Sequence, residues 1–161
     1  MQKSVEDNYI YSLIYHEKKK SEMLKIKDEE IATTNKYICN VRIFNNEMDT
    51  FKDVKALIDT GATFTGVNPS VVKQLRLNPY SFFTYATPDE QKIQKSKYDF
   101  KLKFDNIDTI VEVTGSEMPY ETEKFDAVIG VDVLRLGTLI IDKGNLTFNI
   151  NFWNSNLSII S

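Results

Sequence analysis

The stretch Ala56-Leu57-Ile58-Asp59-Thr60-Gly61-Ala62-Thr63 decides how this chain is interpreted. Three apolar residues lead to an aspartate, and the next two residues are a hydroxyl side chain and a glycine. The Thr60 hydroxyl can hydrogen-bond to a neighbouring loop and so fix the geometry of the turn. Gly61 has no Cβ, so its backbone can approach a substrate or a second carboxylate closely. We expect a buried strand that presents the Asp59 carboxylate at its end.

Two later segments occur in an order that supports this interpretation. Residues Asp126–Leu134 read DAVIGVDVL, and Gly137–Asp142 read GTLIID. Together with Leu57–Ala62, they resemble the retropepsin-like aspartic proteases. Leu57–Ala62 resembles the active-site signature of that family, Asp126–Leu134 resembles the strand beside the catalytic loop, and Gly137–Asp142 resembles the closing hairpin. The resemblance covers residues 36–150.

The resemblance implies a mainly β fold, a single-lobe retropepsin-like acid protease barrel with one or two short helices. We expect residues 36–150 to form this protease domain. Residues 1–35 are expected to be a partly helical N-terminal extension, and residues 151–161 a C-terminal strand or tail that could serve as a dimer interface. In this family Asp59 would be the catalytic residue, with Thr60, Gly61 and Ala62 supporting the active-site loop.

Composition independently describes one ordinary globular domain. The 161 residues are 42% hydrophobic, and their net charge of −3 gives no attraction to nucleic acid or to an anionic membrane. One cysteine and one histidine exclude an internal disulfide and a Cys/His zinc site. No apolar run approaches the ~18 residues of a membrane span, and no targeting segment is recognisable. We therefore expect a cytoplasmic protein with no metal and no other cofactor.

The N-terminal 35 residues differ in pattern from the rest. Tyr9, Leu13 and Ile14 fall near helical spacing, as Met23 and Leu24 do. The basic run in HEKKK is balanced by acidic residues, so we interpret it as a solvated helix face or tether. A nucleic-acid accessory function would depend on this run alone. The one histidine, His16, lies in the same segment. We expect it to be an exposed surface residue rather than a general base.

From Tyr37 onward the apolar period changes to two, which predicts β-strands. Cys39 falls on the apolar face of the first strand, where a free thiol packs as a small hydrophobe; a catalytic cysteine is the alternative. Asn68-Pro69-Ser70 predicts a helix start. A second short helix is expected over Val133–Leu136, closed by a left-handed Gly137. The pattern predicts strands over 37–43, up to 58, and over 80–85, 98–104, 109–113, 125–130, 138–141 and 146–150, the last two joined by a turn at 142–145.

Aspartic protease chemistry needs a second carboxylate, and the chain offers two weak candidates. Asp142 lies in a segment that superficially repeats Leu57–Gly61, but it has Lys143 beside it and a turn around it. Asp132 is expected to cap the short helix. The remaining option is a symmetric homodimer in which Asp59 of one chain meets Asp59 of the other.

The family covers its cleft with a mobile hairpin, the flap, which often carries glycine. The corresponding stretch is Phe82–Lys95, which places Pro88-Asp89 at its tip and contains no glycine. Thr84, Ala86 and Thr87 are the candidate substrate-binding residues on this hairpin. The late aromatic residues are expected to pack the core or a dimer interface; they are Phe148, Phe152 and Trp153.

The function expected from the sequence is that of an aspartic endopeptidase. It would act as a homodimer on a protein or peptide substrate and hydrolyse peptide bonds with a water activated between the two Asp59 carboxylates. The alternative is a catalytically inactive retropepsin-like fold used for protein binding or assembly. The intact Asp59-Thr60-Gly61 favours the enzyme, and the glycine-free flap favours the alternative.

Overall fold

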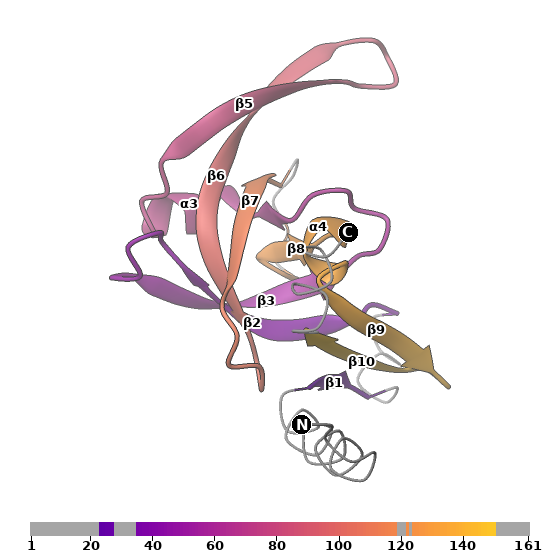
Figure 1. The fold of residues 1–161 in the computed structure, drawn as a ribbon. Helices are drawn as coiled ribbons and strands as arrows, with labels where there is room; N and C mark the ends of the chain where they lie inside the picture. The colour runs from indigo at the N-terminus through magenta and orange to yellow at the C-terminus, as the bar shows by residue number, and fades with distance from the viewer. Residues whose placement is uncertain (1–22, 28–34, 119–121, 123, 151–161) are drawn as a thin grey trace, which may run out of the picture.

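The computed structural model describes residues 23–27, 35–118, 122 and 124–150. These residues form a mainly β structure with two short helices (Figure 1). The elements in chain order are β1 (Leu24–Ile26), β2 (Ile38–Phe44), β3 (Phe51–Ile58), β4 (Gly66–Val67), α3 (Pro69–Gln74), β5 (Pro79–Ala86), β6 (Lys92–Phe104), β7 (Val111–Glu117), β8 (Ala127–Ile129), α4 (Val131–Leu134), β9 (Gly137–Asp142) and β10 (Asn145–Ile150).

Six of the described strands close into a barrel in the order β2-β3-β8-β4-β7-β6, with β6 pairing back to β2. The period-two pattern explains how the barrel fills its interior, because alternate residues point to one side of each strand. On β2 these inward residues are Cys39, Val41 and Ile43, all buried as predicted. Phe100 and Leu102 of β6 fill the same core. The fold class expected from the sequence is therefore confirmed.

The hairpin of β5 and β6 extends beyond the barrel and forms the long arch at the top of Figure 1. β6 has 13 residues, and its two halves pair with different strands. Its first half pairs with β5, from Ala86↔Lys92 to Pro79↔Tyr98. Its second half belongs to the barrel, where it pairs with β7 and β2. The arch is thus a direct continuation of a barrel strand.

A second sheet of three strands, β1-β10-β9, packs at the other end of the molecule (Figure 1). Lys143 and Gly144 form the β9–β10 turn with φ of 49° and 83°, which confirms the predicted hairpin. Phe148 of β10 packs edge-on against Phe104 of the barrel, with ring centroids 5.2 Å apart. Leu24 lies in strand β1, so its assignment to a helical pattern is wrong. The other residues named for that helix, except Met23, lie outside the described residues.

The two helices differ in how well the sequence predicted them. α3 begins after Asn68, whose side chain accepts a hydrogen bond from the Ser70 N–H, as expected. α4 spans Val131–Leu134 rather than Val133–Leu136. Gly137 is not left-handed either; it opens β9, where a Cβ would lie 1.8 Å from the Asn149 carbonyl oxygen of β10. Close strand pairing, not helix termination, therefore requires this glycine.

None of the helices in the described ranges is long and apolar enough to cross a membrane. The predicted C-terminal strand or tail, together with Phe152 and Trp153, lies outside the described residues. Phe148 is fully buried, which confirms its expected place in the core.

Candidate active site

Asp59 follows the last residue of β3, in the middle of the sheet. β3 runs parallel to β8, with Ile58 opposite Ile129. The Asp59 N–H donates to the Ile129 carbonyl at 3.0 Å, which continues the strand pairing by one residue. The Gly61 N–H then donates to Asp59 Oδ1 at 2.8 Å, and the Ala62 N–H donates to the Asp59 carbonyl at 3.2 Å. A tight turn therefore holds the carboxylate by its own loop.

Thr65 fastens the far end of this loop to α4. Its backbone N–H donates to both carboxylate oxygens of Asp132 at 3.0 Å, and its hydroxyl donates to Oδ1 at 2.8 Å. The same hydroxyl oxygen accepts from the Gly130 N–H at 3.1 Å. Thr65 is fully buried and Asp132 is half-buried, so the bonds are shielded from water on the Thr65 side. Asp132 is thus not the N-cap expected from the sequence, since Gly130 occupies that position.

Gly130 lets β8 pass very close to the loop. A Cβ on Gly130 would lie 2.7 Å from the Ala62 carbonyl oxygen and 2.8 Å from the Phe64 carbonyl carbon. The next residue, Val131, donates its N–H to that same Ala62 oxygen at 2.8 Å. This position therefore requires glycine because two backbones meet there.

The outer part of the loop remains open to solvent. Asp59 and Ala62 are half-buried, while Thr60 and Gly61 are exposed. All four predicted active-site residues therefore lie together on one loop, with a firmly bonded base and an accessible tip. One described chain brings a single carboxylate, that of Asp59, to this tip.

Comparison with known proteins decides the fold. No family model and no curated protein matches the chain. A retropepsin-like aspartic protease from Rickettsia conorii matches in structure, with a TM-score of 0.51 and 16% identity over 80% of this chain and 92% of that one. The chain has a retropepsin-like fold. The simian foamy virus protease is also similar, with a TM-score of 0.45 and 18% identity over 62% of this chain and 92% of that one. A Legionella pneumophila protein of unknown function matches with a TM-score of 0.39 and 11% identity, over 62% of this chain and 84% of that one.

In this retropepsin-like fold the β5–β6 hairpin occupies the stretch predicted as the flap. Thr87 opens its turn, with its N–H donating to the Gln91 carbonyl at 2.9 Å and its hydroxyl also bonded to Gln91. Glu90 takes the left-handed conformation, with φ of 64°, where glycine is the usual residue. Thr84 and Ala86 are exposed on one face of β5. Substrate contact by these three predicted residues stays a prediction.

An aromatic cluster that the sequence did not indicate joins the Asp59 loop to this hairpin. The rings of Phe64 in the loop and Phe83 in β5 lie 6.3 Å apart. The Lys97 ammonium of β6 lies 4.7 Å from the Phe64 ring centroid and 5.4 Å from that of Phe83. Such cation–π contacts stabilise by about 0.5–2 kcal/mol. Phe83 lies on the opposite face of β5 from Thr84 and Ala86.

The other candidate catalytic residues lie away from the loop or are chemically unsuited. Asp142 is exposed at the end of β9, beside the turn. Burial, assisted by the charge of Asp105, raises the pKa of the Cys39 thiol to about 12, so it stays protonated and is no nucleophile. His16 lies outside the described residues.

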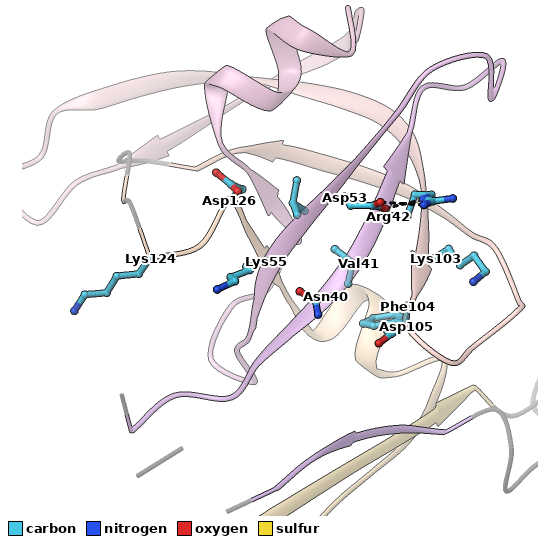
Figure 2. A pocket seen from close by; sticks show the side chains of 11 residues that line it. Asn40, Val41, Arg42, Asp53, Lys55, Lys103, Phe104, Asp105, Lys124 and Asp126 are labelled. Carbon is cyan, nitrogen blue, oxygen red and sulfur yellow. Dashed lines mark hydrogen bonds and ion pairs between the residues drawn. The ribbon is translucent and has the colours of Figure 1, made fainter. Parts of the chain in front are cut away.

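A pocket of about 740 Å³ on the outer face of β2 and β3 is also separate from Asp59 (Figure 2). Side chains of both charges line it, with Lys55 and Asp126 at one side and Lys103 at the other. Arg42 and Asp53 form a two-pronged ion pair across the strands, at 2.7 and 2.9 Å. The pair lowers the pKa of Asp53, chiefly through the hydrogen bond. This surface is a solvated sheet face whose charges largely neutralise one another.

Proposed function

We propose that this protein is an aspartic endopeptidase that acts as a homodimer. The observation that carries the proposal is the Asp59 carboxylate, presented at the open tip of a loop that Thr65 and Asp132 hold at its base. This arrangement keeps a reactive carboxylate in a fixed position, and fixed positioning of reacting groups is a large part of catalysis.

The homodimer supplies the carboxylate that one chain lacks. A two-fold axis beside the Asp59 loop places the same loop of a second chain opposite the first. Thr60 and Gly61 are both exposed, so the loop of a second chain could approach them without obstruction. The Thr60 hydroxyl is then available to bond to the neighbouring loop, and Gly61 allows the two backbones to come close.

Two carboxyl groups within hydrogen-bonding reach share one proton, as in aspartic proteases generally. The ionised Asp59 accepts a proton from the water between them, and the water oxygen bonds to the peptide carbonyl carbon. The protonated Asp59 of the second chain donates its proton to the carbonyl oxygen. Return of a proton to the peptide nitrogen then allows the C–N bond to break, which releases an acid and an amine. Titration is then a property of the pair of carboxyl groups and not of either group alone.

The residues around the pair have supporting tasks. The Gly61 N–H bond to Asp59 Oδ1 orients one carboxylate oxygen and leaves the other to face water and substrate. The β5–β6 hairpin would cover the bound peptide, with Thr84, Ala86 and Thr87 as the proposed contact residues. The left-handed Glu90 makes the hairpin tip less adaptable than a glycine would. That observation favours the second candidate function, a non-catalytic binding or assembly module.

A cleavage assay separates the two functions. Wild-type protein, Asp59→Asn and the control Asp142→Asn are incubated with a mixture of unstructured peptides from acid to neutral pH, and products are identified by mass spectrometry. We expect cleavage by the wild type and by Asp142→Asn, and none by Asp59→Asn. Equal cleavage by Asp59→Asn would assign the activity to another residue. Peptide binding without cleavage by the wild type would support the binding module.

A further inference from the structure

The β5–β6 hairpin has one half-buried face and one exposed face. On β5, Phe83 is half-buried, whereas Thr84 and Ala86 are exposed. On β6, Lys95 and Lys97 are half-buried, and Lys95 pairs directly with Phe83, so these side chains share a face. The half-buried face therefore carries an aromatic ring and two cations. Thr84 and Ala86 point to the other face, so they would contact a peptide beneath the hairpin through their backbone.

The half-buried face of the hairpin is turned toward the loop that carries Asp59. Phe64 belongs to this loop, and its ring lies 6.3 Å from that of Phe83. The Lys97 ammonium lies 4.7 Å from the centroid of the Phe64 ring. Phe64 is 45% exposed, so part of its surface stays open beside this cation. A peptide held between Asp59 and the hairpin therefore passes an exposed aromatic surface and an ammonium group.

The positive charge of this face is not neutralised within the described residues. Among them, neither Lys95 nor Lys97 lies at ion-pair distance from a carboxylate. Glu117, near the base of the hairpin, accepts a hydrogen bond from the Tyr98 hydroxyl at 2.9 Å. Tyr98 follows Lys97 on β6 and so points to the opposite face. The neighbouring aromatic rings exclude water from part of the surface, which strengthens the attraction of these cations for an anionic group.

We propose that Lys97, with Lys95 beside it, selects peptides that carry an acidic side chain close to the bond that is cleaved. The inference rests on the proposed function, because it places the peptide between the Asp59 pair and the hairpin. Glutamate suits this place: its methylene groups pack on the Phe64 ring, and its carboxylate accepts hydrogen bonds from the Lys97 ammonium. A two-fold axis puts one Lys97 on each side of the cleaved bond, so both sides of the substrate should favour an acidic residue.

Peptide binding to the full-length Asp59→Asn protein tests this selection without cleavage. The probes are pools of short, unstructured, fluorescently labelled peptides that are otherwise uncharged and carry Glu, Gln or Lys at a central position. Dissociation constants are measured by fluorescence anisotropy. Glu and Gln have nearly the same shape, so the ratio of their dissociation constants isolates the effect of charge. We expect the Glu pool to bind about threefold to tenfold more tightly than the Gln pool.

Substitutions of Lys97 in the same Asp59→Asn protein assign the selection to one cation. Lys97→Met should bring the Glu-to-Gln ratio to about one, and Lys97→Arg should keep the preference for Glu. Lys97→Glu should reverse it, so that the Lys pool binds more tightly than the Gln pool. Lys92→Met is the matched control, because Lys92 pairs with Ala86 on the exposed face of the hairpin. A loosened hairpin weakens the binding of all pools alike and leaves their ratios unchanged, so the reversal does not depend on hairpin stability.

The outcomes for selection and for catalysis are distinguishable. Equal binding of the Glu and Gln pools would overturn the inference, as would an unchanged ratio in Lys97→Met or a protein that binds none of the pools. Wild-type protein that cleaves peptides without favouring acidic residues would support the protease and contradict the selection. A preference for Glu that depends on Lys97, in a protein whose wild type cleaves no peptide, would support the selection and contradict the protease.

Discussion

The carboxylate of Asp132 accepts hydrogen bonds from both the backbone N–H and the hydroxyl of Thr65, 67 residues earlier in the chain. Thr65 is buried in the loop that follows Asp59, and Asp132 lies in the first turn of α4. The contact therefore ties the candidate active-site loop to the helix that leads into β9. It gives the loop a fixed base without using the residues at its tip.

Removing this carboxylate should loosen the loop. We expect Asp132→Ala to lower the free energy of unfolding by about 2–4 kcal/mol, because hydrogen bonds to a charged group contribute about 1.5–3 kcal/mol each. Asp132→Asn keeps one acceptor oxygen and should lose about 1 kcal/mol. Urea unfolding followed by fluorescence measures both values. An Asp132→Ala protein as stable as the wild type would show that the bonds carry no net stability.

Gly130 should tolerate no side chain. Gly130→Ala places a methyl group against the backbone of Ala62 and Phe64 and should cost about 1–3 kcal/mol. Gly66→Ala is the matched control, since its Cβ would lie 3.2 Å from the flexible Met118 side chain. We expect a loss below about 1 kcal/mol there. Chemical denaturation of the two variants compares them, and equal losses would contradict the close-approach explanation.

Lys97 should restrain the base of the β5–β6 hairpin. Lys97→Met keeps the aliphatic stem but removes the cation between Phe64 and Phe83. We expect amide hydrogen exchange in the hairpin to accelerate by about threefold to tenfold, in line with a cation–π contribution of about 0.5–2 kcal/mol. Lys97→Arg should restore protection, and Lys92→Met, near the tip, should not alter it. Unchanged exchange in Lys97→Met would reject this role.

Alkaline pH should destabilise the fold through Cys39. Burial raises the thiol pKa from 9.0 to about 12 in the folded chain, so below pH 9 both the folded and unfolded states hold the proton. Between pH 9 and about 12 the unfolded state loses it first, and stability falls by up to about 4 kcal/mol. Unfolding free energies of the wild type and Cys39→Ala, measured across this range, should converge as pH rises. Parallel curves would contradict the buried, protonated thiol.

Sequence patterns predicted the parts of the fold that depend on local chemistry. The period-two run of Cys39, Val41 and Ile43 placed β2 and its buried face correctly, because alternation alone determines which side chains point inward. Asn68 began α3 as expected, because its side chain caps a backbone N–H two residues away. The Asp59 loop was also found from the sequence, since an apolar strand followed by Asp-Thr-Gly is a compact local signal.

Features that depend on distant parts of the chain were missed. Gly137 looked like a helix end, but contact with Asn149 of β10 explains it. Leu24 belongs to a three-residue strand, which is too short to show a period and forms through pairing with β10. The cluster of Phe64, Phe83 and Lys97 combines a loop and two strands, so the spacing of residues within one segment could not predict it.

The central claim is that each active site needs Asp59 from both chains, and subunit mixing tests it most directly. Wild-type protein is exchanged with an equal amount of Asp59→Asn, and the initial rate of peptide cleavage is compared with that of wild type at the same total concentration. Random pairing leaves about a quarter of the dimers with two intact carboxyls, so we predict about a quarter of the wild-type rate. A rate of about half would mean that each chain acts with its own carboxylate and would contradict the account.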